Sequence, residues 1–317
     1  MSMSNWILFS QNNWHNGGNS TEQYARTLKE KCLYIQGTAS RAEGEEDGVR
    51  FGPQLEKFWV PNVTRDTIAM FCKPTFKAYQ YMRMIKDIGG KVIYRAVDDW
   101  ELWKGNEWYD QAIEKAMIEL ADVAVSTSIR VAMKYGIKRL PNACYYVSSI
   151  PTITRSIKKV GFIGDVDNQV SSARFDMNIV IYLAERFPRL NFVLCGSRVS
   201  WELPSNIQVL PYCKWKEANR QLENIDVGFI PYYGEEMSGV QPLKSWEYLG
   251  YGLPQLAPEG LDLPDHSSVS TYRSYEECGD KLEVILNTSY CWDSIIEFAK
   301  QNTWRKRLEQ LERMLGL

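Results

Sequence analysis

The sequence predicts an α/β protein made of two Rossmann-like domains, each built around a parallel sheet. Its 317 residues are enough for two domains. In both halves, short apolar runs alternate with longer segments of helical period, which is the pattern of strands joined by crossover helices. Because such strands run parallel, we expect ligands at their carboxyl ends.

The first half opens with a strand, a loop that contains Gly17 and Gly18, and a helix. This loop lacks the G-x-G-x-x-G spacing, so the sequence does not indicate a dinucleotide. Residues 38–56 are polar and acidic, and we predict a mobile loop there. The elements predicted in this half are strands at 6–10, 92–97 and 123–126 and helices at 21–31 and 107–120.

The second half repeats the alternation after the polar stretch 145–157, which is typical of an interdomain linker. The elements predicted here are strands at 159–163, 191–195, 207–210, 226–230 and 254–257 and helices at 174–187, 215–223, 242–251 and 274–286. The last segment carries an apolar stripe at helical spacing, which should dock on the protein. This stripe is formed by Trp304, Leu308, Leu311 and Leu315.

The composition is that of an ordinary globular protein, with 44% hydrophobic and 24% charged residues. The net charge of −2 and the lack of a dominating basic track argue against nucleic-acid binding through electrostatics alone. The seven cysteines form no C-x-x-C pair, and several lie in apolar runs. We therefore expect reduced, mostly buried thiols and a cytoplasmic location.

No run of 18 apolar residues occurs in the sequence, so no membrane span is predicted. The beginning of the chain lacks the apolar core of a signal peptide. Residues 71–91 carry five basic side chains among aromatic residues and Met. This segment leaves a peripheral membrane contact open, although the favoured interpretation is a helix packed on a sheet with a basic outer face.

Residues 226–257 are the most informative part of the chain, with the order strand, loop, helix, strand. The apolar strand ends at Pro231, and Pro242 opens the helix at a position where its missing N–H costs nothing. Gly252 and Pro254 end the helix. A helix N-terminus just beyond the carboxyl end of a strand is suited to binding an anion.

Lys244 and Glu247 lie on one side of this helix when it is drawn at 100° per residue. A lysine near the N-terminus can contact a diphosphate, and a glutamate one turn later can accept hydrogen bonds from ribose hydroxyls. The alternative is a solvated ion pair, which would contribute a few tenths of a kcal/mol.

This segment resembles the donor-site signature of GT-B glycosyltransferases, the group related to glycosyltransferase family four and to bacterial glucuronosyltransferases of exopolysaccharide synthesis. The residues that match are Pro242, Leu243, Lys244, Glu247, Tyr248, Leu249, Gly252 and Pro254. Four further segments match in order and spacing, at 94–100, 121–128, 141–142 and 160–164.

The resemblance implies a GT-B fold, which is two Rossmann-like domains with parallel sheets and a cleft between them. Residues 1–153 would form the acceptor-side domain, with the C-terminal helix 300–317 packing back on it. Residues 154–299 would form the domain that binds the nucleotide sugar.

One position departs from the family pattern. Many members carry two glutamates eight residues apart, and the second of them matches Glu247, whereas the first position here is Gly239. In that pattern the earlier glutamate contacts the transferred sugar, so its absence leaves the donor sugar and the stereochemical outcome open.

The resemblance implies a donor site in the second domain. Gly164, at a strand end, would let a phosphate approach the backbone. Arg174 matches a position that can reach the diphosphate, with a surface arginine as the alternative. The turn at Tyr212 and Cys213 would meet the nucleotide base through backbone groups. The expected donor-binding residues are Gly17, Gly18, Gly164, Arg174, Tyr212, Cys213, Met237, Ser238, Gly239, Val240, Gln241, Pro242, Leu243, Lys244 and Glu247.

The first domain would hold the acceptor and the catalytic base. Asp98 and Asp99 follow a predicted strand, where a carboxylate could deprotonate an acceptor hydroxyl. The alternative for either is helix capping. His15 could act as base or oxyanion partner, and a solvated loop histidine is an equal alternative. Gly17 and Gly18 beside it could direct backbone N–H groups toward the donor phosphates.

No cofactor or metal is expected beyond the nucleotide-sugar substrate. Asp165 and Asp167 form a D-x-D pair, which we interpret as part of a loop because the resemblance is to a metal-independent fold. No cluster of His and Cys indicates zinc.

The sequence therefore predicts a metal-independent glycosyltransferase that moves a hexose-type sugar from a nucleoside diphosphate, UDP above all, to an acceptor hydroxyl. The acceptor stays open between a glycan, a lipid-linked glycan, a small molecule and modified DNA. Two alternatives remain: an enzyme that glycosylates hydroxymethylated DNA bases, and a non-catalytic protein that binds nucleotide sugars or glycans.

Overall fold

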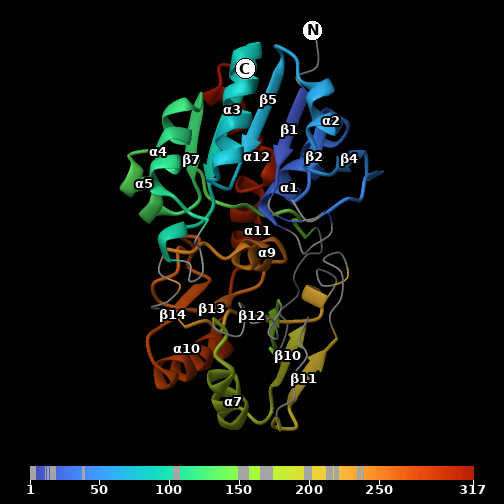
Figure 1. Cartoon of the computed structure of the whole chain (residues 1–317). Helices are drawn as coiled ribbons and strands as arrows, with labels where there is room; N and C mark the ends of the chain where they lie inside the picture. The colour runs from blue at the N-terminus through green and yellow to red at the C-terminus, as the bar shows by residue number, and fades with distance from the viewer. Residues whose placement is uncertain are drawn as a thin grey trace. The chain divides into compact units, whose positions relative to one another are not determined.

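The computed structural model describes residues 5–10, 12, 14, 19–37, 40–102, 108–148, 157–164, 174–195, 202–211, 217, 221–233, 237 and 239–317. The chain divides into two compact units. Unit 1 comprises Met1–Asn142 and Trp304–Leu317, and unit 2 comprises Ala143–Thr303. Each unit contains one sheet that is wholly or almost wholly parallel, as predicted (Figure 1).

The sheet of unit 1 has the strand order β3-β4-β2-β1-β5-β6-β7-β8, and only the β3–β4 pair is antiparallel. Its strands are β1 (Asn5–Phe9), β2 (Cys32–Ile35), β3 (Gly44–Glu46), β4 (Val49–Gly52), β5 (Thr67–Phe71), β6 (Lys91–Ala96), β7 (Val123–Ser126) and β8 (Lys138–Arg139). The strands predicted at 6–10, 92–97 and 123–126 are confirmed. Strands β2 and β5 were not predicted, because they are buried along their whole length and so show no alternation of polar and apolar residues.

The mobile loop predicted at 38–56 is wrong for its second half. Strands β3 and β4 form a hairpin there, and the chain reverses at Asp47 and Gly48, which both have positive φ (51° and 78°). Asp-Gly is the dipeptide that favours such a turn. The carboxylate of Asp47 also accepts a hydrogen bond of 2.9 Å from Arg26, so the acidic tip of the hairpin is tied to the unit.

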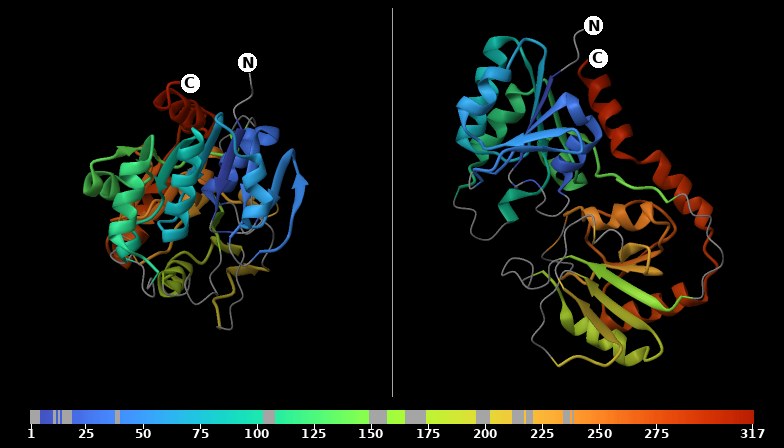
Figure 2. Two further views of the ribbon diagram at one scale, coloured as in Figure 1. Left: turned by 45° about the horizontal axis from the view of Figure 1, so that its top comes forward. Right: turned by 90° about the vertical axis from the view of Figure 1, so that its right-hand side faces the viewer.

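Helices cover both faces of the unit 1 sheet (Figure 2). On one face α1 packs against α12, and on the other α3 packs against α4. The helices are α1 (Ser20–Leu28), η1 (Lys29–Lys31), α2 (Glu56–Trp59), η2 (Val60–Asn62), α3 (Phe76–Ile88), η3 (Trp100–Leu102), α4 (Gln111–Leu120), α5 (Ile129–Tyr135) and α12 (Trp304–Met314). The side chains of Asn19, Thr75 and Asp110 cap the N-termini of α1, α3 and α4.

The apolar stripe predicted for the end of the chain is buried in unit 1. Trp304, Leu308 and Leu311 of α12 are at most 2% exposed. The indole of Trp304 packs edge-on against the ring of Tyr24 in α1, with ring centroids 4.9 Å apart. Burial of these side chains explains why α12 belongs to the same unit as the first part of the chain.

The sheet of unit 2 is fully parallel and has the order β11-β10-β9-β12-β13-β14. Its strands are β9 (Lys159–Ile163), β10 (Asn191–Cys195), β11 (Ile207–Leu210), β12 (Val227–Phe229), β13 (Gln255–Pro258) and β14 (Val269–Tyr272). Its helices include α7 (Met177–Arg186), α9 (Leu243–Gly250), α10 (Tyr275–Asn287) and α11 (Trp292–Gln301). All five predicted strands are confirmed, whereas β14 and α11 were not predicted, and most of the helix predicted at 215–223 lies outside the described residues.

Both sheets reverse their strand order once, between β1 and β5 in unit 1 and between β9 and β12 in unit 2. At such a point the connections leave in opposite directions, which opens a crevice at the carboxyl ends of the two central strands. These two points are therefore where the fold itself favours a ligand.

The six cysteines in the described residues are all free, and five of them are buried. This agrees with the predicted reduced thiols, while Cys213 lies outside the described residues. Within the described part of the chain, every helix is too short or too polar to span a lipid bilayer.

Candidate functional site

Gly164 and Lys244 lie together at the switch point of unit 2. Gly164 follows the last residue of β9, and its N–H donates to the carbonyl of Cys195 at 2.9 Å. A Cβ atom built on Gly164 would lie 2.8 Å from the ring of Phe162 and 3.2 Å from Nζ of Lys244. Because Gly164 has no side chain, the ammonium group of Lys244 can lie close to the backbone at this position.

The ammonium group of Lys244 is held by aromatic residues. Its Nζ donates a hydrogen bond to the hydroxyl of Tyr232 and lies 4.8 Å and 4.9 Å from the ring centroids of Phe162 and Tyr232. No carboxylate among the described residues pairs with it. A cation in this position adds to the positive end of the α9 dipole, so the site favours an anion.

Helix α9 carries this lysine on a well-fixed support. Pro242 is its N-cap residue, and the buried Tyr248 donates to the carbonyl of Phe229 at 3.2 Å. Gly228 and Gly250 allow close packing, because a Cβ atom would lie 2.2 Å from the Tyr248 ring in the first case and 2.1 Å from the carbonyl oxygen of Tyr146 in the second. The helix therefore sits tightly against the sheet and its neighbours.

The two faces of α9 differ in burial. Lys244 and Glu247, which the helical wheel placed on one side, are half-buried, as is Leu243. The buried residues are Ser245, Trp246, Tyr248, Leu249 and Gly250. Binding of ribose by Glu247 stays a prediction.

The loop before α9 has a backbone that suits glycine. Gly239 has a φ of 77°, and its N–H donates to the carbonyl of Gly260 at 3.0 Å. A glutamate in this conformation would be strained, which gives a local reason for the departure from the family pattern. Met237, Gln241 and Pro242 of the same segment are buried, and Val240, whose carbonyl accepts from the N–H of Asp262, is half-buried.

Arg174 lies near the same edge of the sheet. Its carbonyl accepts a hydrogen bond of 3.0 Å from the N–H of Tyr233, and the next residue, Phe175, forms a β-bridge with Tyr232. The structure thus brings Gly164, Arg174 and Lys244 close to the segment that follows β12.

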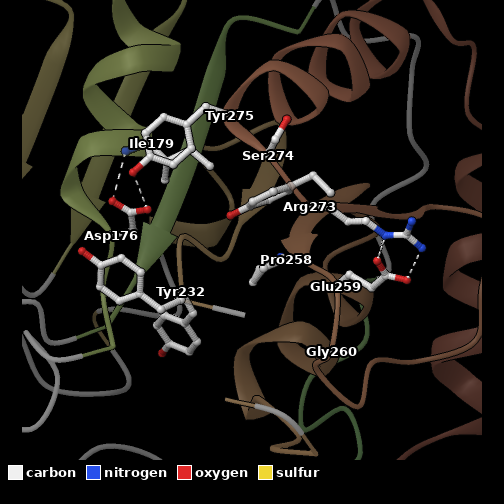
Figure 3. A pocket seen from close by; sticks show the side chains of 11 residues that line it. Asp176, Ile179, Tyr232, Pro258, Glu259, Gly260, Arg273, Ser274 and Tyr275 are labelled. Carbon is white, nitrogen blue, oxygen red and sulfur yellow. Dashed lines mark hydrogen bonds and ion pairs between the residues drawn. The ribbon is translucent and has the colours of Figure 1, made fainter. Parts of the chain in front are cut away.

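A pocket of about 650 Å³ opens beside Tyr232 in unit 2 (Figure 3). Its walls come from the carboxyl ends of β12, β13 and β14 and from the N-termini of α7 and α10. It is lined by Asp176, Ile179, Tyr232, Tyr233, Pro258, Glu259, Gly260, Tyr272, Arg273, Ser274 and Tyr275. This pocket was not predicted, although the tyrosines that follow β12 and end β14 could have indicated it.

The charged groups of this pocket are paired with one another or with backbone groups. Asp176 caps α7 through the N–H of Ile179 and accepts a hydrogen bond of 2.7 Å from the Tyr275 hydroxyl. Burial and then this hydrogen bond raise the pKa of Tyr275, so the hydroxyl stays protonated. Arg273 forms a bidentate pair with Glu259, and this hydrogen bonding lowers the pKa of the glutamate (Figure 3).

In unit 1, the two predicted carboxylates occupy different environments. Asp99 is buried, and its oxygens pair with Nε of Arg130 at 3.2 Å and with Nζ of Lys134 at 3.0 Å. Its backbone carbonyl accepts a hydrogen bond from the N–H of Leu102 in η3. Asp98 is half-buried. A catalytic role for either residue stays a prediction.

Several predicted residues lie outside the described part of the chain. They are His15, Gly17, Gly18, Asp165, Asp167, Tyr212, Cys213 and Ser238. Among the described residues, no group of three or more His, Cys, Asp or Glu side chains is arranged to hold a metal ion.

Comparison with known proteins identifies the fold. No family model and no curated protein sequence matches the chain. Among solved structures, Anabaena HepE in complex with UDP and glucose has a TM-score of 0.67 at 14% identity, with 99% of each chain covered. A UDP-forming trehalose-phosphate synthase from Burkholderia xenovorans has a TM-score of 0.64 at 11% identity, also with 99% of each chain covered.

A third similar structure is S. aureus TarM in complex with UDP and other ligands. Its TM-score is 0.58 at 12% identity, and the match covers 82% of the present chain and 58% of TarM. These structures are GT-B glycosyltransferases, so the chain has the GT-B fold that the sequence predicted.

Proposed function

We propose that this protein is a glycosyltransferase that moves a hexose-type sugar from a UDP-linked donor to an acceptor hydroxyl. The observation that carries the proposal is the position of the Lys244 ammonium, beside Gly164 at the switch point of the unit 2 sheet. The GT-B fold supports it, because similar structures bind UDP or UDP-glucose.

In the proposed reaction, the bond between the anomeric carbon and the diphosphate breaks as the acceptor oxygen bonds to that carbon. Negative charge develops on the departing diphosphate, and Lys244 and the N-terminus of α9 would stabilise it. Arg174 would add a second cation from the start of the α7 segment. These groups would supply the charge stabilisation that a metal supplies in other enzymes, so we propose that the reaction is metal-independent.

Tyr232 connects the position of the Lys244 ammonium with the larger pocket of unit 2. Its hydroxyl holds Lys244, and the same side chain lines the 650 Å³ pocket. Ligand pockets commonly have volumes of about 300–1,000 Å³. We therefore place the donor along Tyr232, with its diphosphate at Lys244 and part of the molecule in this pocket.

We assign the role of general base to Asp98, which is half-buried just after β6, whereas Asp99 is buried. Both oxygens of Asp99 are engaged by Arg130 and Lys134, and the residue is only 6% exposed. Those pairs suit a carboxylate that orders the end of β6. Asp98 would take the proton from the acceptor hydroxyl as the new bond forms.

Titration calorimetry with UDP tests the donor site. A hydrogen bond to a charged group contributes about 1.5–3 kcal/mol, so Lys244→Met should weaken UDP binding by about 10- to 100-fold. Lys300→Met, which removes an exposed lysine of α11, is the matched control and should leave UDP affinity unchanged.

The same preparations should be assayed for UDP release from UDP-sugars in the presence of acceptors. UDP binding that never leads to transfer would favour the non-catalytic alternative. If the wild-type protein does not bind UDP, or if Lys244→Met binds it as tightly as the wild type, the proposed donor site is wrong.

A further inference from the structure

A second cavity, of about 220 Å³, lies in unit 1 at the switch point between β1 and β5. It is lined by Phe9, Ser10, Gly37, Gln54, Phe71, Cys72, Lys73, Thr75, Lys77, Ala78 and Trp108. These residues come from the carboxyl ends of β1 and β5, the segments after β2 and β4, the start of α3, and Trp108. The cavity is therefore where this sheet topology favours a ligand.

The charge of this cavity is positive. Lys73 and Lys77 line it, and no aspartate or glutamate of the described part of the chain does. Neither ammonium forms an ion pair with a described residue. The thirteen-residue helix α3 begins at the cavity with Thr75 as its N-cap and has no acidic residue in its first turn, so its dipole adds to the positive potential.

Lys73 is fixed in place by an aromatic ring. Its Nζ lies 3.8 Å from the ring centroid of Trp108. Burial lowers the pKa of Lys73, and no carboxylate among the described residues forms an ion pair with it. An anionic ligand would offset the desolvation cost of such a partly buried ammonium, so the site favours binding of an anion.

The rest of the lining suits a small polar ring. The rings of Phe9 and Phe71 stack with centroids 4.3 Å apart and form an apolar wall. The amide of Gln54 makes no hydrogen bond to a described residue, and Thr75 contributes a hydroxyl. The volume is below the range of about 300–1,000 Å³ typical of drug-sized ligands and suits a single sugar unit.

The proposed general base follows the strand next to this cavity. Strand β6 ends two residues before Asp98 and pairs in parallel with β5, whose carboxyl end lines the cavity. Asp98 therefore follows a strand end at the same edge of the sheet as the cavity.

We propose that this cavity binds the acceptor, and that the acceptor is a sugar carrying an anionic group, a phosphate or a carboxylate, which Lys73 and Lys77 bind. The assignment of the ligand as acceptor rests on the proposed function, whereas the binding of an anionic sugar does not. The hydrogen-bonding groups would contact the ring, and the two lysines would select against neutral sugars.

Calorimetry with glucose 6-phosphate, glucuronate and glucose tests the proposal on the full chain. We expect at least one of the two anionic sugars to bind about tenfold or more tightly than glucose, and the stronger of the two identifies the anionic group. The double variant Lys73→Met/Lys77→Met should lose this preference, because Met keeps an apolar stem over Trp108 and removes the charge. Lys73→Arg/Lys77→Arg should keep the preference.

The matched control is Lys57→Met/Lys115→Met, which removes two exposed lysines of unit 1 that do not line the cavity. It should keep the preference, and all variants should bind UDP as the wild type does, which also shows that they are folded. Equal binding of glucose and both anionic sugars, or a preference that survives Lys73→Met/Lys77→Met, would overturn the inference.

The two proposals can fail separately. Lysine-dependent binding of an anionic sugar by a protein that does not bind UDP would leave this site standing and remove the proposed function. If the protein binds UDP and transfers sugar but Lys73 and Lys77 have no effect, the proposed function stands and the anionic-sugar site is wrong.

Discussion

The two switch-point sites differ in how their charges are balanced. In unit 2, Arg273 pairs with Glu259, and Asp176 with Tyr275 and the start of α7. In unit 1, Lys73 and Lys77 line a cavity to which no carboxylate of the described residues contributes. The same topology thus supports one pocket with internally paired charges and one with an excess of positive charge.

This difference distinguishes charged residues with a structural role from charged residues that are available to bind a ligand. A paired charge has already recovered much of its desolvation cost, so it can hold a loop in place without a ligand. A partly buried ammonium without a counter-ion has not recovered that cost. Lys244 lies between these cases, because the Tyr232 hydroxyl and two aromatic rings hold its ammonium without neutralising it.

The largest effect is expected from the two carboxylates that follow β6. Asp98→Asn should lower turnover by about 10²- to 10⁴-fold, because general base catalysis typically contributes that much. Asp99→Asn should act mainly on stability, since it weakens pairs with Arg130 and Lys134. Steady-state rates and denaturant unfolding of both variants measure the two effects. A larger loss of turnover for Asp99→Asn would reverse the assignment.

A smaller effect is expected from filling the space at Gly164. In Gly164→Ala the new methyl group would press on Phe162 and displace the Lys244 ammonium, so UDP affinity should fall by about tenfold. The comparison variant is Gly136→Ala, whose methyl group meets no atom within 4 Å but whose φ is 64°. Gly136→Ala should lower the stability of the protein but leave its UDP affinity unchanged, because Gly136 lies outside the donor site. Equal UDP affinity in Gly164→Ala and Gly136→Ala would show that Gly164 is not part of the donor site.

The smallest effect is expected from the paired charges of the unit 2 pocket. Arg273 and Glu259 are 76% and 49% exposed at their side chains, and exposed ion pairs contribute little to stability. Arg273→Gln should therefore leave the midpoint of denaturant unfolding almost unchanged, and it should change UDP affinity by no more than about twofold because Glu259 already engages the guanidinium. A tenfold loss of UDP affinity would show that Arg273 contacts the ligand and would break the distinction between the two kinds of charge.

Local signals were enough to predict much of the fold. The strands of unit 2 were predicted because each is a short apolar run between polar segments, as at 159–163 and 191–195. The α9 segment was predicted from Pro242 and Gly252, which set its limits through their own backbone preferences. The β3–β4 hairpin was missed because its strands are short and polar, and only the Asp47-Gly48 turn marked it.

The candidate sites could be predicted only in part. The pairing of Lys244 with Tyr232 crosses twelve residues of chain and depends on how β12 and α9 pack. The ion pairs that engage Asp99 come from α5, about thirty residues further along. No local pattern distinguishes Asp98 from Asp99, because their difference arises from the neighbours that the fold supplies.

The sequence by itself determined that the chain forms two parallel α/β sheets and that a lysine stands at the start of a helix after a buried strand, because periodicity and capping act over a few residues. Only the tertiary structure decided which charges are paired and where the cavities lie. The cavity of Lys73 is built from segments between Phe9 and Trp108, and a pocket of this kind exists only once strands distant in sequence lie side by side. Which charges of the cavity are paired depends on the folded unit, because packing, rather than the neighbouring residues in the sequence, sets the solvation and the partners of each side chain.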